Sequence, residues 1–330
     1  MDDASLGAVG KILVTGAAGQ IGSDLVPELR KLYGNENVVA AGHVTPLPED
    51  IRASGPCINL NVRRYEDVER IIKEHGVTVV YHLSSLLSAL AEANRPLAYD
   101  VNFTGVFNVL EASLANGVKR VNLPSSIAVF GADAPSLHTP NDVSLNPTSL
   151  YGVSKVYGET MGTYYRRLGL DVRGTRLPGI ISWKTEPTAG TTDYAVAIFY
   201  GALSEGRYTC YLRPNTALPM MYMPDAIRSL ILLDQADPTR LVHSANFNLH
   251  AFSFTPAQIA REIEARIPGF QIDYEIDPLR QAIADSWPDS IDDSAAREEW
   301  DWKPEYDLPA MVDDMLANLG PKLARRQKGA

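Results

Sequence analysis

The sequence predicts an α/β protein with a Rossmann-type, doubly wound parallel sheet and a smaller, loop-rich C-terminal domain. Between Lys11 and about Leu177, short β-branched runs alternate with longer segments of helical period, as in stacked βαβ units. A glycine triplet follows the first of these runs directly. Beyond Pro178 the regularity breaks, and Pro and Gly are scattered through 180–190 and 212–224. We therefore place a domain boundary between residues 177 and 178, which gives domains of 1–177 and 178–330.

Individual elements follow from local patterns. The strand candidates are the β-branched runs Ile12–Thr15, Val38–Ala41, Val77–Leu83, Val118–Leu123 and Val172–Leu177. After the first strand, one helical face is formed by Ile21, Leu25, Leu29 and Leu32, which should pack on the sheet. Val101–Leu114 shows a similar apolar stripe and predicts another covering helix.

The C-terminal part also carries two clear signals. Thr255, Pro256 and Gln258 form the pattern of a capping box with a proline at the first helical position, so a late helix should begin there. In Gln271–Asp277 apolar and polar residues alternate, as in a half-buried strand. Some of these later segments are expected to return to the first domain.

Composition and charge exclude several classes of protein. The 330 residues carry a formal net charge of −10 and a pI near 5.1, which disfavours nucleic acid and anionic membranes as partners. Cys57 and Cys210 offer neither a disulfide framework nor the spacing of a metal site, so no metal is expected. Met1–Gly10 lack the features of a secretion signal, and no apolar run has bilayer-spanning length. A cytoplasmic location is therefore expected.

The glycine triplet predicts a dinucleotide-binding loop. Gly16, Gly19 and Gly22 lie at intervals of three, directly after a strand and before a helix. Gly16 permits the tight turn, Gly19 lets the backbone approach a pyrophosphate, and Gly22 allows close packing of helix on strand. With Gln20 and Ile21, these residues place free N–H groups at the helix N-terminus, where a diphosphate binds. The alternative is an ordinary tight turn.

The usual acidic residue about 20 positions further on, which binds the adenosine ribose, is missing. Gly42 and His43 stand there instead, and no Arg nearby would receive a 2′-phosphate. The choice between NAD and NADP is therefore open on these residues alone. Asn61 and Val62 are candidates for adenine contacts, with a plain turn as the alternative.

A Tyr-x-x-x-Lys pattern supplies candidate catalytic groups. Tyr151 and Lys155 lie four residues apart, hence on the same face of a helix. A neighbouring ammonium favours the phenolate by charge attraction, so Tyr151 could take the proton of a substrate hydroxyl while hydride leaves the same carbon. Ser125 and Ser126 follow the strand Val118–Leu123 at its carboxyl end, where ligands of such sheets bind. The alternatives are an exposed surface pair and a turn-capping serine pair.

With these motifs, the chain resembles the extended short-chain dehydrogenase/reductase family, whose patterns are Thr-Gly-x-x-Gly-x-x-Gly and Tyr-x-x-x-Lys. The resemblance covers nearly the whole chain. Several longer strings are similar to one branch of that family, which acts on L-threonine: Gly179–Lys184, Gly190–Val196, Leu218–Asp225, Ala284–Pro288 and Ile291–Ser294.

The resemblance implies oxidation of the L-threonine β-hydroxyl to L-2-amino-3-oxobutyrate, with NAD⁺ as hydride acceptor. Ser126 and Tyr151 would contact the hydroxyl, and Lys155 would hold the nicotinamide ribose. The further positions that would line the cofactor are Leu83, Ser84, Ser85, Asn102, Leu177, Pro178 and Ile180. Those that would contact the substrate are Ser88, Gly179, Thr191, Thr192 and Trp287.

Several of these residues have plain structural alternatives. Thr191–Asp193 reads equally as a helix N-terminus with a capping hydroxyl or carboxylate, and Trp287 as loop packing. Met220–Met223 is expected in the core, and His82 is expected to be a hydrogen-bonded structural histidine. Ser85 stands where many relatives have a small apolar residue.

The resemblance further implies a homodimer in which two helices of each subunit form a bundle. Gly158 and Gly162, one turn apart on the helix of Tyr151, would suit such close helix packing. Packing within one subunit would explain them as well.

Three other functions are alternatives to this one. A nucleotide-sugar 4-epimerase or reductase shares both motifs, but its substrate diphosphate calls for basic side chains, and the loop-rich region offers mainly Lys184, Arg207 and Arg213. A non-catalytic NAD sensor has no need of Ser126, Tyr151 and Lys155 together. A zinc-dependent dehydrogenase is excluded because two isolated cysteines cannot build its metal sites.

Overall fold

The computed structural model describes residues 10–188 and 190–329, which divide into two compact units. The first unit contains the chain up to Ser126, together with Thr148–Arg176 and Ile227–Phe247. The second contains Ile127–Pro147, Leu177–Ala226 and the chain from Asn248 onward. Residues 1–9, on which the expectation of a missing secretion signal rests, lie outside the described residues.

The first unit is built on a six-stranded sheet in which every pairing is parallel, in the order β3-β2-β1-β4-β5-β7. Val14 of the central strand pairs with Ala40 on one side and Tyr81 on the other. This confirms the predicted Rossmann-type fold, and the order reverses between β1 and β4, where such sheets bind ligands. The strands are β1 (Lys11–Thr15), β2 (Val38–Gly42), β3 (Cys57–Asn59), β4 (Val77–His82), β5 (Arg120–Asn122) and β7 (Asp171–Arg173).

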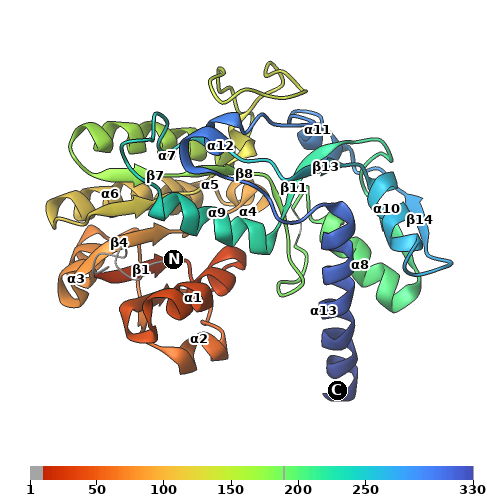
Figure 1. Ribbon diagram of the computed structural model, residues 1–330, viewed down its shortest axis with the longest axis horizontal. Coiled ribbons are helices and arrows are strands. Elements are labelled where there is room, and N and C mark those ends of the chain that lie inside the picture. Colours follow the sequence, from red (N-terminus) through yellow and green to blue (C-terminus); the bar gives the residue numbers. More distant parts are fainter. Residues whose placement is uncertain (1–9, 189, 330) are drawn as a thin grey trace. The chain divides into compact units, whose positions relative to one another are not determined.

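Helices cover both faces of this sheet, as Figure 1 shows for α1 on one side and α6 and α7 on the other. On the α6 and α7 side, the buried side chains of Val80, Val121 and Val172 form one cluster with Ile72 and Val109. The helical elements of this unit are α1 (Gln20–Tyr33), the 3₁₀ turn η1 (Asn35–Asn37), α2 (Glu49–Ser54), α3 (Tyr65–His75), α4 (Ser88–Ala93), α5 (Arg95–Tyr99), the π-helical turn η2 (Asp100–Thr104), α6 (Gly105–Ala115) and α7 (Leu150–Arg167).

The helices predicted from apolar periodicity are present, with two differences. In α1, Leu25 and Leu29 are fully buried, but Leu32 is 49% exposed, because α1 ends one residue later at Tyr33 and its last turn passes the edge of the core. The helix expected over Val101–Leu114 begins with a π-helical turn, a local widening that often marks a functional site.

The predicted strand Val172–Leu177 is divided into β7 and β8 (Thr175–Leu177) by Gly174. The backbone of Gly174 bonds to Ser244 O and Phe247 N, and a Cβ there would lie 2.3 Å from Leu123 O. This contact with a distant segment ends the first strand. The strand expected over Val118–Leu123 is confirmed in its central part as β5.

The second unit contains two small sheets. Strand β11 (Leu218–Tyr222) lies between β9 (Gly179–Ile181) and β13 (Phe252–Phe254), and β10 (Arg207–Cys210) pairs in parallel with β14 (Gln271–Tyr274). The predicted strand and capping box are confirmed, since Thr255 Oγ1 accepts from Gln258 N. The helices are η3 (Ile127–Val129), α8 (Tyr194–Glu205), α10 (Pro256–Glu264), α11 (Pro278–Ala284), α12 (Ser294–Trp300) and α13 (Leu308–Gly329).

The boundaries between the units fall partly inside secondary structure. Besides β8, the helix α9 (Met223–Gln235) and the strand β12 (Phe247–Asn248) each contribute residues to both units, while β6 (Ser125–Ser126) ends the first segment. The expected first domain, 1–177, differs from the first unit at residues 127–147, which belong to the second unit. There, Thr139 N donates a hydrogen bond to Ser290 O. The assignment of cofactor binding to one domain and substrate binding to the other stays a prediction.

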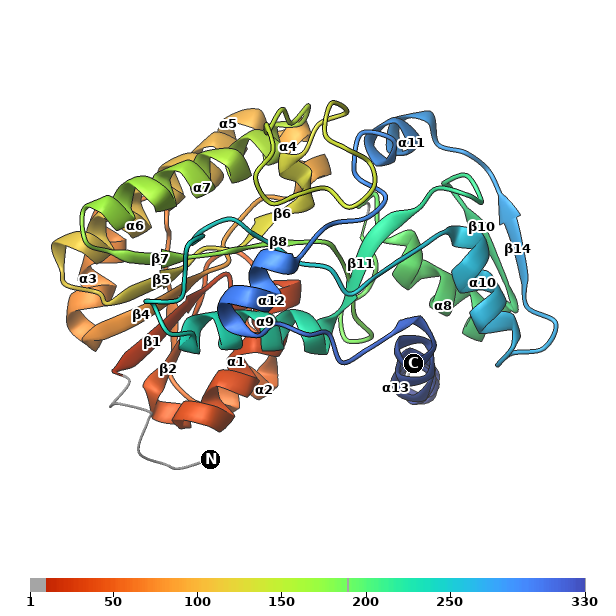
Figure 2. The ribbon, with the colours of Figure 1, turned by 45° about the horizontal axis from the view of Figure 1, so that its top comes forward.

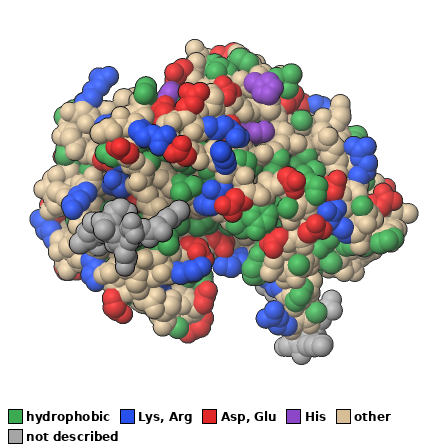
Figure 3. All heavy atoms as spheres, viewed as in Figure 1, with side chains coloured by type: hydrophobic (Ala, Val, Ile, Leu, Met, Phe, Trp, Pro, Cys, Tyr) green, Lys and Arg blue, Asp and Glu red, His purple; other side chains and the backbone are tan. Residues whose placement is uncertain are grey.

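Charged side chains of both signs are interspersed on the face drawn in Figure 3. Among the described residues, no helix is long and apolar enough to cross a bilayer.

Candidate active site

Helix α7 carries the predicted catalytic pair. Ser149 caps it by accepting a hydrogen bond from Gly152 N at 3.1 Å, which places Tyr151 in the first turn. Lys155 follows one turn later, and its Nζ lies 5.4 Å from the centre of the Tyr151 ring. The two side chains therefore share one face of the helix, as their spacing predicts.

Tyr151 is partly buried, and its phenol is hydrogen-bonded to Ser126. Burial raises its pKa to about 12, and the bond with Ser126 acts in the opposite direction with a smaller effect. The acid form of Tyr151 is therefore favoured. The lowering of this pKa by Lys155 stays a prediction, because burial and the bond with Ser126 are the causes of the shift seen here.

The Lys155 ammonium is bound by a backbone oxygen just after the end of strand β5. Its Nζ donates to Pro124 O at 2.9 Å. Burial lowers the pKa of Lys155 to about 8, while the nearby Glu159 carboxylate raises it by a smaller amount. Near neutral pH the ammonium form of Lys155 is thus only moderately favoured over its neutral form.

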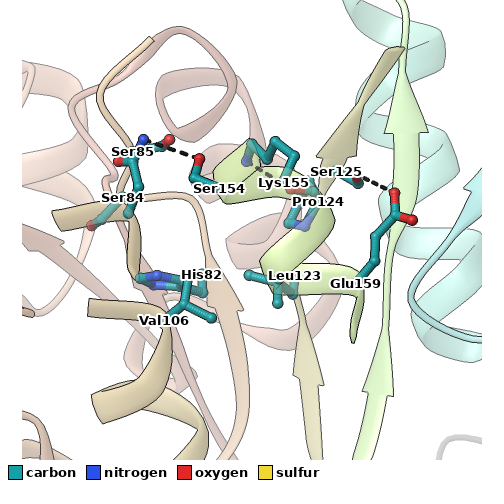
Figure 4. Close-up of a pocket in the computed structure, with 12 residues that line it drawn as sticks. His82, Ser84, Ser85, Val106, Leu123, Pro124, Ser125, Ser154, Lys155 and Glu159 are labelled. Carbon is teal, nitrogen blue, oxygen red and sulfur yellow. Dashed lines mark hydrogen bonds between the residues drawn. The ribbon is translucent and has the colours of Figure 1, made fainter. Parts of the chain in front are cut away.

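A buried ionic network lies one turn beyond Lys155 on the same helix. Glu159 binds Arg176 through both carboxylate oxygens, with Nε at 2.9 Å and Nη2 at 2.8 Å. Ser125 Oγ donates to the same carboxylate at 2.5 Å, which Figure 4 marks with a dashed line. No motif of the sequence predicts this network, although the spacing of four between Lys155 and Glu159 indicates that both lie on one helix face.

A cavity opens beside this pair, entirely within the first unit. Figure 4 shows Lys155 and Ser154 on one side of it and His82, Val106 and Leu123 on the other. Three of the predicted cofactor positions, Ser84, Ser85 and Asn102, line it as well.

The loop of residues 83–87, which follows β4, is fixed by Asn102. Asn102 Oδ1 accepts from Leu86 N at 2.8 Å and its Nδ2 donates to Leu86 O at 2.9 Å. A further bond of 3.3 Å from Nδ2 to Ser154 Oγ connects the loop to the catalytic helix. The residues predicted to line the cofactor are thereby held next to Lys155.

The glycine loop leaves room for backbone only. Gly16 has φ +68°, and a Cβ there would lie 2.7 Å from Leu83 C. A Cβ on Gly22 would lie 2.4 Å from Gly16 O, and one on Gly19 would lie 3.2 Å from the same atom. These are the close approaches that a diphosphate-binding turn requires before a helix N-terminus, here that of Gln20 and Ile21. The residues present therefore fit a dinucleotide.

At the expected adenosine end, Gly42 closes β2, and the next residue, His43, contacts Asn59 with Nδ1 3.3 Å from Oδ1. Asn61 Oδ1 accepts from Arg63 N at 3.2 Å, and Val62 is buried in the core. The turn reading of Asn61 and Val62 is thus confirmed, and a contact of either residue with adenine stays a prediction.

The predicted substrate residues fall in both units. Ser88 begins α4 in the first unit. In the second unit, Gly179 and Thr192 lie in contact, since a Cβ on Gly179 would be 2.9 Å from Thr192 Cγ2. The neighbouring Thr191 is buried. The alternative of a helix N-terminus is confirmed, because α8 begins at Tyr194 with Asp193 as its N-cap residue. The Asp193 carboxylate makes no side-chain cap bond to α8 and instead accepts from Thr188 N and Oγ1.

The remaining predicted positions also lie in the second unit. Trp287 packs against the apolar cluster of this unit, as the loop-packing alternative states. Met220, Met221 and Met223 are buried, so the expectation of a core role is confirmed. Leu177 ends β8, Pro178 follows it, and Ile180 lies in β9.

Gly158 and Gly162 face inward. A Cβ on Gly158 would meet Leu123 at 3.5 Å, and one on Gly162 would meet Ala245 at 2.7 Å. Packing within one subunit therefore explains both glycines.

Comparison with known proteins agrees with this geometry. Residues 12–235 match the model of the NAD dependent epimerase/dehydratase family. The chain therefore belongs to this family, and NAD is its cofactor.

Several relatives share most of the chain's length. The mitochondrial L-threonine 3-dehydrogenase of Sus scrofa is 46% identical over 93% of this chain and 82% of its own length. The crystal structure of L-threonine dehydrogenase from Clostridium difficile is 45% identical, with a TM-score of 0.93 over 95% of this chain and 98% of the other. A metagenomic L-threonine 3-dehydrogenase described as monomeric is 44% identical, with a TM-score of 0.89 over 94% and 99% of the two chains.

A more distant likeness shows the fold alone. A UDP-glucose 4-epimerase from Thermotoga maritima has a TM-score of 0.83 at 21% identity, over 95% of this chain and 99% of the epimerase chain. The architecture by itself therefore does not separate the two activities.

Proposed function

We propose that this protein is an L-threonine 3-dehydrogenase, which oxidises the β-hydroxyl of L-threonine to L-2-amino-3-oxobutyrate with NAD⁺ as hydride acceptor. The observation that carries the proposal is the Tyr151 phenol, bonded to Ser126 and one helical turn from the Lys155 ammonium. The strong likeness to relatives that bear this name supports the choice of substrate over a nucleotide sugar.

In the proposed reaction, Tyr151 accepts the hydroxyl proton and Ser126 holds the reacting oxygen. Bound NAD⁺ supplies the hydride acceptor and one positive charge. Because burial raises the pKa of Tyr151 to about 12 despite the bond with Ser126, the phenolate must be favoured by positive charge in the loaded site. Lys155 is the protein's own source of that charge, and its one-turn spacing from Tyr151 keeps it within electrostatic reach.

The cofactor would be held by the first unit. Gly16, Gly19 and Gly22 would take the diphosphate, and Lys155 the nicotinamide ribose. Leu83, Ser84, Ser85, Asn102, Leu177, Pro178 and Ile180 are proposed to line it. Ser88, Gly179, Thr191, Thr192 and Trp287 are proposed to contact L-threonine.

The proposal extends to a cytoplasmic homodimer. Helices α5, α6 and α7 lie side by side in Figure 2 and carry the exposed apolar side chains of Tyr99, Phe107, Val153 and Tyr164. Such a patch is typical of a protein interface. Sedimentation of the purified protein checks it: a dimer that becomes a monomer in Phe107→Asp supports the interface, whereas a monomeric wild type contradicts it.

The activity is tested by following NADH formation with L-threonine and NAD⁺ for the wild type, Tyr151→Phe and Tyr65→Phe. Tyr65 lies on α3, outside the candidate site and the proposed interface, and among the described residues its hydroxyl makes only a 3.4 Å bond to Glu69, so its variant is a matched control. We expect turnover in the wild type and the control, and a loss of at least about 10²-fold in Tyr151→Phe with NAD⁺ affinity preserved. Wild-type protein that binds NAD⁺ but leaves L-threonine unchanged contradicts the proposal, and turnover of UDP-sugars would then be measured.

A further inference from the structure

The hydrogen bonds around Thr15 determine the tautomer of His82. His82 ends β4 and is 4% exposed, with Nδ1 2.8 Å from Thr15 Oγ1. The same oxygen accepts from Ser84 N at 3.3 Å and from Leu83 N at 3.2 Å, an N–H that it shares with the backbone oxygen of Thr15. A hydroxyl has two lone pairs and one hydrogen, so with two N–H groups directed at its lone pairs the Thr15 hydroxyl is placed to donate its hydrogen to His82. Nδ1 is then an acceptor, and the ring proton of neutral His82 sits on Nε2.

The ring is held in the neutral form. Burial lowers the pKa of His82 to about 3, and the positive charge of Lys155 acts in the same direction. Across the ordinary pH range, His82 therefore presents a single Nε2–H donor whose direction is fixed by Thr15.

This donor has no acceptor among the described residues, although it is buried. A buried donor left unsatisfied is costly and rare in native proteins. His82 and Lys155 both line the cavity described above. The volume in this cavity that the centre of a water molecule can occupy is about 20 Å³. That volume holds one water molecule.

The chemistry of the cavity favours water over an ion. Two donors border it, His82 Nε2–H and the ammonium of Lys155, of which one N–H is used by Pro124 O. Ser85, Ser125 and Ser154 line it as well and offer hydroxyl oxygens to the hydrogens of a water molecule. A halide would accept from both donors but would lie in the same cavity as the Glu159 carboxylate.

We propose that His82 binds an internal water molecule in this cavity, that this water also accepts a hydrogen bond from Lys155, and that His82 is thereby a positioning residue for the lysine charge. The other titratable and charged groups around Lys155 are Tyr151 and Glu159, the latter paired with Arg176. The water acceptor adds to Pro124 O in stabilising the ammonium. The proposal rests on the role given to Lys155 above, but its tests need no turnover.

The tautomer is tested by NMR of protein labelled with ¹⁵N-histidine, because the two ring nitrogens have different shifts in each tautomer. His82→Gln assigns the signals. We expect Nε2–H from pH 5 to pH 9, as the Thr15 bond requires. A proton on Nδ1, or a charged ring within this range, overturns the inference.

The effect on Lys155 is measured as its pKa in the ligand-free protein, from the ¹³Cε signal of labelled lysine assigned with Lys155→Arg. His82→Gln keeps an N–H near the position of Nε2, whereas His82→Leu removes it. We expect the wild-type value to persist in His82→Gln and to fall by about one unit in His82→Leu, as loss of one acceptor to a charged donor implies.

Equal pKa values for Lys155 in the wild type and His82→Leu overturn the proposal, as does an equal fall in both variants. Should His82→Leu not fold, Thr15→Val replaces it, because loss of the hydroxyl frees the ring to move its proton to Nδ1, and Thr15→Ser is the control. Failure of L-threonine turnover alone leaves both NMR results in place and affects only the proposed function.

Discussion

The side-chain amide of Asn102 pairs with the backbone of Leu86 through both of its polar atoms, as a neighbouring strand would. Asn102 lies in the π-helical turn η2 and is 3% exposed. Because Leu86 belongs to the loop that carries the predicted cofactor residues, a single buried side chain fixes that loop.

Asn102→Asp should release the loop, because it replaces an N–H donor by an oxygen that repels Leu86 O. We expect a loss of about 1–3 kcal/mol in local stability, seen as faster amide exchange at Leu86, together with weaker NAD⁺ binding. Asn116→Ala, near the end of α6, removes a side-chain bond to Ala112 O and serves as the control. Unchanged exchange at Leu86 in Asn102→Asp would contradict this reading.

Gly22→Ala should abolish NAD⁺ binding while Gly320→Ala should not. The added Cβ at Gly22 would lie 2.4 Å from Gly16 O and 2.7 Å from Ala17 Cα, so the turn must move. At Gly320, within helix α13, no atom lies within 4 Å of the added Cβ, and a gain of up to about 1 kcal/mol is expected from helix propensity. Calorimetric titration with NAD⁺ measures both; normal affinity in Gly22→Ala refutes the assignment of the loop.

Glu159→Gln should destabilise the first unit by about 3–5 kcal/mol, because it removes the carboxylate charge that binds the buried Arg176 guanidinium, which is 2% exposed, through both oxygens. The control is Asp273→Asn, which breaks the Arg207 pair of similar length, 2.8 Å, between side chains that are more than half exposed. That pair should contribute less than about 1 kcal/mol. Urea denaturation of the three proteins compares the two losses, and equal losses would disprove the argument.

The stability of the protein should fall in acid partly through His82. Its pKa is about 3 in the folded protein against about 6.5 when unfolded, so below pH 6.5 only the unfolded chain takes up the proton. The contribution of neutral His82 to the free energy of unfolding is therefore fully present above pH 6.5 and is lost as the pH falls toward 3. The loss between pH 7 and pH 5 should be about 2 kcal/mol.

His82→Gln removes the titrating group, so its free energy of unfolding should change less over that interval than the wild type's. His43→Gln, at an exposed position, should behave as the wild type does. Denaturation curves at pH 7 and pH 5 decide: parallel losses in wild type and His82→Gln would mean that His82 is not buried in its neutral form.

The elements predicted from local pattern are those whose cause is local. Strand β1, the glycine turn and helix α1 follow from adjacent residues, as does the Thr255 capping box. The break of a strand at Gly174 has its cause 70 residues further on, in the bonds with Ser244 and Phe247, and no local pattern reports it.

The candidate site likewise combines features with a local cause and features with a distant cause. The motif spacing places Tyr151 and Lys155 on one helix face. The Tyr151 pKa, however, depends on burial by the whole fold, and the Glu159–Arg176 pair joins a helix to a strand. Such effects arise only when distant residues pack, so the spacing of the motif does not report how burial raises the pKa of Tyr151.

The alternation of the two units along the chain has a consequence for synthesis on the ribosome. Each unit consists of three segments, and the segments of the two units alternate along the chain. The chain therefore passes from one unit to the other five times, and helix α9 contributes residues to both units. The first unit lacks its last segment until Phe247 has left the exit tunnel, which at about 5–20 residues per second delays its completion by several seconds after Arg176 is made. Nascent chains stalled before Phe247 should therefore remain sensitive to protease, even though all six strands of the parallel sheet have already been translated.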